Sequence, residues 1–85
     1  MNQFTGQVVF NDRLQDWVFY NVDGTTDQSL TTASAGQDPQ PGKIDLAEYK
    51  DEYLLVEGIW DHAWIREAKI VQHSAEPIAG ESRGG

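Results

Sequence analysis

The stretch YLLVEGIWDHAWIREAKIV, residues 53–71, decides the fold. Residues 53–60 form the aliphatic and aromatic run that is typical of a β-strand. The polar trio Asp-His-Ala at 61–63 interrupts this pattern, and residues 64–71 resume it. Two strand patterns joined by a short turn predict an antiparallel hairpin, with a tryptophan on either side of its tip.

A second hairpin is predicted near the N-terminus. Residues 4–10 alternate with the period of a strand that turns one face inward, and the expected inward residues are Phe4, Gly6, Val8 and Phe10. A glycine in mid-strand suggests a bulge or bend at that point. After a polar turn at 11–16, the aromatic and β-branched residues 17–22 predict the partner strand.

The middle of the chain is polar and carries few strand signals. Residues 24–43 contain one large apolar side chain, Leu30, among Pro and Gly, and predict only a weak third strand near 29–33. The remainder is expected to be a long loop, either mobile or functional. Residues 44–50 predict a short helical turn capped by Asp45, with an inner face made by Leu46 and Tyr49.

Composition and length predict one small globular domain. Its core is small, because a chain of 85 residues buries only roughly 60% of its unfolded surface. We expect the domain to span residues 1–73 and residues 74–85, which are small, polar and Gly-rich, to form a disordered tail. The sequence has no cysteine, which excludes disulfides and thiolate chemistry. A membrane span and signal-peptide features are also absent, so a cytoplasmic location is expected.

The charge balance opposes binding to a polyanion. Fourteen acidic residues against six basic ones give a net charge of −8, and the basic residues are scattered rather than gathered into a patch. Because nucleic-acid binding relies on contacts between basic groups and phosphates, this balance favours protein partners, a cationic ligand or simple solubility.

The order strand, strand, weak strand, short helix, strand, strand resembles the OB-fold superfamily. The second half carries most of the resemblance, in the segments IDLAEY at 44–49, YLLVEG at 53–58 and AKIV at 68–71. A short helix there leads into a strand ending in a Val-x-Gly step, and the last strand has an Ala-x-Ile pattern. The resemblance covers residues 4–71, without pointing to a subfamily. It implies a mostly β, five-stranded Greek-key barrel with one short helix between strands 3 and 4.

The resemblance also implies a binding face on the second and third strands, helped by the loops that join strands 1 to 2 and 4 to 5. Transferred to this sequence, the face would include Trp17, Phe19 or Tyr20, and the loops would supply Arg13, Trp60, His62 and Trp64. Two interpretations of Trp60 stay open. It is either part of the interior, in phase with Leu54 and Val56, or an exposed ring that stacks on a ligand.

The other face of residues 53–60 offers a second candidate surface. It carries Tyr53, Leu55 and Ile59, and a barrel cannot bury both faces of one strand. Either the loop at 24–43 covers these side chains, or they form a patch for a protein partner or a second copy of the chain.

The sequence does not indicate a metal-binding, catalytic or phosphate-binding site. His62 and His73 would sit at opposite ends of one strand, too far apart for a shared metal at roughly 3.3 Å per residue. No serine, histidine and acid suggest a triad, and no Gly-rich loop fits a phosphate. We therefore expect no catalytic residues, no metal, no cofactor and no enzyme activity.

Taken together, the patterns predict a small acidic binding module that binds a protein partner or itself. The surface would include Tyr20, the outer side of 53–59 and Trp64. Single-stranded nucleic acid is the first alternative. An acidic face at 45–61 that imitates nucleic acid is the second. The third is a ubiquitin-like modifier that uses the final Gly84-Gly85, although residues 24–36 lack the apolar spacing of the helix in that fold.

Overall fold

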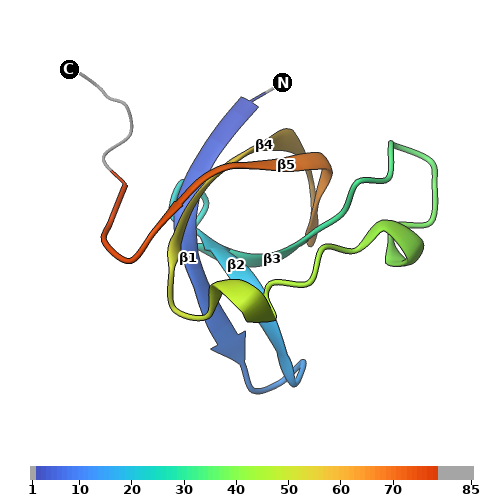
Figure 1. The fold of residues 1–85 in the computed structure, drawn as a ribbon. Coiled ribbons are helices and arrows are strands. Elements are labelled where there is room, and N and C mark those ends of the chain that lie inside the picture. Colours follow the sequence, from blue (N-terminus) through green and yellow to red (C-terminus); the bar gives the residue numbers. More distant parts are fainter. Residues whose placement is uncertain (1, 79–85) are drawn as a thin grey trace.

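Five strands form one sheet that closes on itself (Figure 1). The computed structural model describes residues 2–78. Its strands are β1 (Asn2–Asn11), β2 (Asp16–Asn21), β3 (Thr26–Leu30), β4 (Tyr53–Asp61) and β5 (Trp64–Ser74). The order around the ring is β1-β2-β3-β5-β4, and β4 pairs with β1 to close it. Only the contact of β3 with β5 is parallel. The expectation of a mostly β chain with five strands is confirmed.

The connection between β3 and β4 contains two short 3₁₀ turns, η1 (Gln40–Gly42) and η2 (Ala47–Tyr49). The helical turn expected at 44–50 is η2, but its N-cap residue is Leu46 and not Asp45 as predicted. The Asp45 carboxylate accepts a hydrogen bond from the Ala47 N–H at 2.9 Å. Leu46 is buried and Tyr49 packs against the core, as their spacing predicted. The third strand was misplaced: β3 begins at residue 26 and not at 29.

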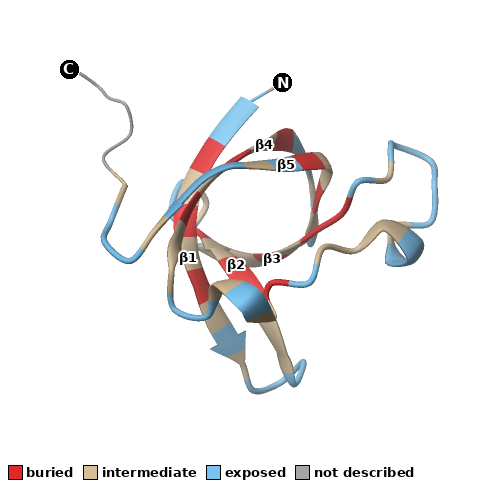
Figure 2. Ribbon diagram, viewed as in Figure 1, coloured by how far each residue is buried: buried red, intermediate tan, exposed pale blue. Residues whose placement is uncertain are grey.

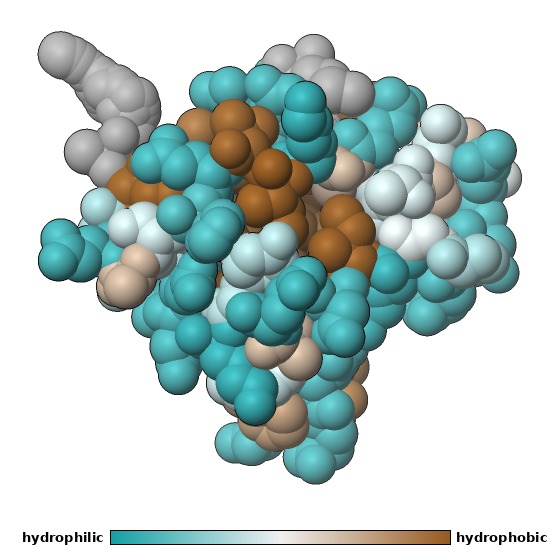
Figure 3. All heavy atoms as spheres, in the orientation of Figure 1, coloured by the Kyte–Doolittle hydropathy of each residue, from teal (hydrophilic) through white to brown (hydrophobic). Residues whose placement is uncertain are grey.

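The core fills the inside of the ring (Figure 2). Each strand turns alternate side chains inward, and Leu46 from the β3–β4 connection joins them. The buried cluster consists of Phe4, Val8, Phe19, Leu30, Leu46, Leu54, Val56, Ile65 and Ala68. In Figure 3 apolar side chains gather over the middle of the ring and polar ones surround them.

Phe10 was expected in the core, and this expectation is wrong, because 44% of it is exposed. The reason is the length of the first hairpin, which extends beyond the ring (Figure 1). The ladder of β1 with β4 ends at Gln7, whereas its ladder with β2 continues to Asn11. Phe10 therefore lies past the closed part of the sheet, where it meets the edge of the Trp17 ring at 5.4 Å between centroids.

Close approaches and bulges shape the ring. A Cβ atom on Gly6 would lie 2.0 Å from the Tyr20 carbonyl oxygen, so only glycine fits where β1 bends against β2. Opposite β4, β5 carries an extra residue at two points, and Glu67 at the second point has a φ of 51°. Bulges of this kind increase the local bend of a strand. At its start β5 pairs with β4 and with β3 as well, through Trp64 and Ile65.

The C-terminal part of the ring runs further than expected. Ser74, where the tail was expected to begin, belongs to β5. Pro77 and Ile78 line a hollow of about 180 Å³ together with Tyr53 and neighbouring residues. The rest of the expected tail, 79–85, lies outside the described residues. Among residues 2–78 there is no helix with the length and apolar character that crossing a membrane requires.

Candidate binding groove

A groove with a volume of about 320 Å³ lies on the outer face of β2 and β3. Five parts of the chain surround it: the β1–β2 turn, β2, β3, the β3–β4 connection and the tip of the β4–β5 hairpin. The lining residues are Leu14, Asp16, Val18, Asp27, Gln28, Ser29, Gln40, Lys43, Ala63 and Trp64.

The period of the strands explains which side chains face the groove. Phe19 and Leu30 point into the core, so the residues in the opposite phase point outward. On β2 these are Asp16 and Val18, which is covered to 1% exposure at the bottom of the groove, and on β3 they are Asp27 and Ser29. The floor is therefore a mixture of two carboxylates, a hydroxyl and one aliphatic side chain.

Lys43 forms an ion pair with Asp16 at one side of the groove. The backbone holds Lys43 there through its bridge to Thr31 and through the adjacent Ile44 N–H, which donates to the Leu30 carbonyl at 2.9 Å. The hydrogen bond from Lys43 lowers the pKa of Asp16 below its ordinary value. Asp16 is thus an ionised carboxylate whose partner comes from the same chain.

Asp27 is the second carboxylate, and it has no ion pair within residues 2–78. Its Oδ2 accepts a hydrogen bond from the Asn11 side-chain amide at 2.9 Å. Asn11 in turn accepts a hydrogen bond from the Leu14 N–H at 3.0 Å, which orders the β1–β2 turn. The side chain of Asn11 therefore positions both the Asp27 carboxylate and the backbone of Leu14. Because Asp16 and Lys43 are paired, Asp27 gives the lining one negative charge in excess.

The groove has an apolar wall on either side. Leu14 projects from the β1–β2 turn with 57% of its surface exposed, a large value for a leucine. Trp64 starts β5 on the other side and is half-buried. Apolar walls with a few placed polar groups are the usual composition of ligand sites.

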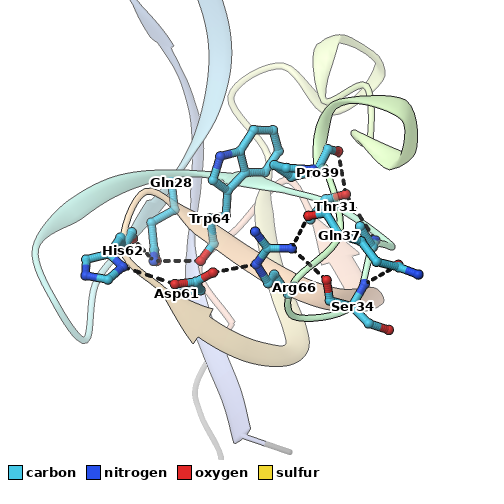
Figure 4. A network of polar contacts seen from close by, with 10 residues as sticks. Gln28, Thr31, Ser34, Gln37, Pro39, Asp61, His62, Trp64 and Arg66 are labelled. Atoms are coloured by element: carbon cyan, nitrogen blue, oxygen red, sulfur yellow. Dashed lines mark hydrogen bonds and ion pairs between the residues drawn. The ribbon is translucent and has the colours of Figure 1, made fainter.

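Buried hydrogen bonds fix the hairpin tip that carries Trp64 (Figure 4). Gln28, which is fully buried, donates to the His62 carbonyl at 2.8 Å and, at 3.4 Å, more weakly to the Trp64 carbonyl. Its own oxygen accepts from the Asn21 amide at 2.9 Å. The Ala63 carbonyl also accepts a hydrogen bond from the Ser29 N–H at 2.9 Å. The tip is therefore tied to β3 at three consecutive residues.

Arg66 ties the loop after β3 to the same hairpin (Figure 4). Its guanidinium forms an ion pair with Asp61 and donates to the carbonyls of Ser34 at 2.7 Å and Gln37 at 2.9 Å. Only 11% of this side chain is exposed. The hydrogen bond from Arg66, followed by that from His62, lowers the pKa of Asp61. The loop that was expected to be mobile or functional is thus held by specific contacts.

The residues predicted from the resemblance are only partly brought together. Trp64 lines the groove, Arg13 is exposed next to Leu14 in the β1–β2 turn, and the His62 side chain is exposed at the hairpin tip. Tyr20 lies on the outward side of β2 and is half-buried, but it does not line the groove.

Trp17 is not on the outer face, which corrects the expectation from the resemblance. It lies in phase with Phe19 and packs against the core, and the Lys50 ammonium lies 5.7 Å from the centre of its ring. The interior interpretation of Trp60 also needs correction, since 41% of it is exposed. Its indole lies 5.7 Å from the Phe4 ring between centroids, and it is exposed because the buried part of β4 ends at Gly58.

The second candidate surface is separate from the groove. Tyr53, Leu55 and Ile59 lie on β4, whose neighbours in the ring are β1 and β5 and not β2 or β3. Tyr53 and Leu55 are half-buried, and Ile59 is 40% exposed. The two surfaces thus lie on the outer face of different strands around the ring.

The groove also contains residues that sequence analysis missed, chiefly Leu14, Asp27 and Lys43. The only local signal is the exposed leucine in a polar turn. These residues line one groove because of the strand register, which pairs Tyr20 with Asp27, and because of the path of the β3–β4 connection.

Metal-binding residues do not gather in the part of the chain that the structure describes: no group of three His, Cys, Asp or Glu side chains is placed to hold an ion. His62 and His73 have separate carboxylate partners, Asp61 at 3.0 Å and Glu52 at 2.8 Å. Comparisons of the chain with protein-family models, curated proteins and solved structures found no match.

Proposed function

We propose that this chain is a small non-enzymatic binding module with an OB-like architecture, which binds a protein partner in the groove on β2 and β3. The strand order supports the architecture. β1, β2 and β3 follow one another in antiparallel pairs and β4 returns beside β1, which is the spatial order 4-1-2-3 of a Greek key. A short helical turn also lies between β3 and β4.

The position of the groove is the observation that carries the function. OB-fold proteins bind ligands on the face of strands 2 and 3 between the loops that join strands 1 to 2 and 4 to 5. Leu14 from the first of these loops, Ala63 from the second and the adjacent Trp64 at the start of β5 line the groove. Its apolar walls suit the side chains of a polypeptide, and the net charge of −8 favours a protein over a polyanion.

Single-stranded nucleic acid is the second candidate, because the same face binds oligonucleotides in OB-fold proteins. Two observations about charge oppose it. The whole chain is acidic, and Lys43, the only cation in the lining among residues 2–78, is already paired with Asp16. Fluorescence anisotropy with a labelled oligothymidine at low salt separates the two candidates. Tight binding that weakens steeply as salt rises would favour nucleic acid.

The remaining alternatives have less support. Of the acidic residues proposed to imitate phosphates, Asp61 is engaged in an ion pair with Arg66 and Glu52 lies 2.8 Å from His73 Nδ1. The Gly84-Gly85 terminus of the modifier hypothesis lies outside the described residues. Absence of catalysis is part of the proposal, and a hydrolytic activity that disappears in His62→Ala would refute that part.

Capture from an extract of the source cells tests the proposed function. Ser29→Arg places a long cationic side chain in the groove, while Gln72→Arg makes the same charge change at an exposed site on β5. We expect a partner that the natural chain and Gln72→Arg capture equally and that Ser29→Arg loses. Circular dichroism confirms that both variants fold. Equal capture by both variants would exclude the groove as the binding site.

A further inference from the structure

We propose that the groove recognises a basic side chain of the protein partner, a lysine or an arginine. Its charged end would lie at the Asp27 carboxylate and its aliphatic stem between Leu14 and Trp64. This inference rests on the proposed function, because it specifies what the partner presents to the groove.

The charges in the lining favour a cation. Asp16 and Lys43 neutralise each other, and Asp27 has only the neutral amide of Asn11 as a side-chain partner within residues 2–78. Since an unpaired carboxylate in a concave site attracts a positive group, the excess charge at Asp27 selects a basic side chain over a neutral or acidic one. The chain's charge of −8 acts in the same direction at longer range.

Lys43 shows that the groove accommodates an alkylammonium group. Its side chain lies along the lining with its ammonium on Asp16, and only 31% of it is exposed. The other carboxylate of the same groove lies on the neighbouring strand, β3. A lysine from a partner would therefore repeat at Asp27 a contact that the chain already makes at Asp16.

The apolar walls suit the stem of such a side chain. Lysine and arginine bury their methylene groups against apolar surface while the charged end stays in a polar environment. Leu14 and Trp64 provide that surface, and a tryptophan ring also attracts cations through its π-electrons. Three properties of one groove, its charge, its walls and its own lysine, thus agree on one kind of occupant.

The test uses n-butylammonium, the end of a lysine side chain, and uncharged n-butanol as its matched control. Both are titrated at millimolar concentrations and constant ionic strength into ¹⁵N-labelled protein. We expect n-butylammonium to shift the amide signals of Asp27 and Ser29 and the indole signal of Trp64 more strongly than n-butanol does. Asp27→Asn should weaken binding of n-butylammonium by about fivefold, as for one partly exposed ion pair. Asp23→Asn, which removes the same charge from the exposed β2–β3 turn, should not.

A second pair of variants tests the role of Lys43. Lys43→Met removes the ammonium from Asp16, so n-butylammonium should bind more tightly to this variant than to Lys50→Met, which loses the same charge beside Trp17. Equal shifts by n-butylammonium and n-butanol, or equal binding by Asp27→Asn and Asp23→Asn, would overturn the inference. The capture experiment with Ser29→Arg is independent. If it succeeds while the Asp27 result fails, the groove binds the partner without recognising a basic side chain.

Discussion

Replacing Gln28 with methionine should destabilise the domain by about 2–4 kcal/mol, because the buried Asn21 amide loses its partner at about 1–3 kcal/mol and the part-buried His62 carbonyl loses a hydrogen bond worth about 1 kcal/mol. The Asn21 amide, which is fully buried, would lose its acceptor at 2.9 Å, and the His62 carbonyl would lose its donor at 2.8 Å. The Trp64 carbonyl at 3.4 Å contributes little. Methionine has a similar volume, so the loss reflects hydrogen bonding rather than a cavity.

Urea denaturation measures this effect, with Gln72→Met as the control. Gln72 is exposed on β5, so the same substitution there should change the free energy of unfolding by no more than about 0.5 kcal/mol. For Gln28→Met the midpoint of thermal unfolding should fall by roughly 10–25 °C. The amide signals of His62 and Trp64 should shift as the hairpin tip loosens. A destabilisation below about 1 kcal/mol would refute the conclusion that this network fixes the tip.

Two further outcomes are expected. Acid should weaken the fold through Asp16 and Asp61, because the pKa values of both carboxyl groups in the folded chain lie below the ordinary 3.8. As the pH falls, the unfolded chain takes up these protons first. The stability that the two groups contribute is therefore present above pH 3.8 and is lost as the pH falls through their folded pKa values. The double variant Asp16→Asn, Asp61→Asn should therefore show a flatter dependence of unfolding free energy on pH below 4 in urea titrations; an unchanged slope would contradict these ion pairs. Arg66→Met should release residues 32–43 and raise their amide hydrogen exchange by about tenfold, while unchanged exchange would show that other contacts hold the loop.

The strands could be predicted because their signals are local. Residues 53–60 and 64–71 have strand composition on both sides of a short turn, and the structure places β4 and β5 there with ends that differ by at most three residues. β3 was harder to place because its buried residue Gln28 is polar and its strand signal is weak. Its place in the core depends on hydrogen bonds to Asn21 and to the hairpin tip, which no local pattern reveals.

The alternation of apolar residues predicted which face of a strand points inward, but not where the closed part of the sheet ends. Phe10 and Trp60 both lie in phase with buried neighbours, and both are more than 40% exposed. Each lies beyond the last buried position of its strand, Val8 on β1 and Gly58 on β4. A side chain on the inward face of its strand is therefore buried only where distant strands pair to close the sheet, and the length of the hairpin decides whether it lies there.

Sequence analysis predicted a binding surface at this position but not most of the residues that line the groove. The resemblance predicted a surface between the β1–β2 turn and the β4–β5 tip with Trp64 in it, and in the structure Leu14, Ala63 and Trp64 line one groove. Asp27 and Lys43 lie 16 residues apart, in β3 and in the connection that follows, and they line one groove because this connection folds back beside the end of β3. The path of an irregular segment depends on tertiary contacts, so its lysine could not be assigned from sequence.

The most direct test of the binding groove is a map of the surface that the captured partner covers on the ¹⁵N-labelled chain. Binding in the groove predicts that the largest signal changes occur at Leu14, Ser29 and Trp64. Changes confined to Leu55, Ile59 and Val71, on the β4 and β5 side of the ring, would contradict it.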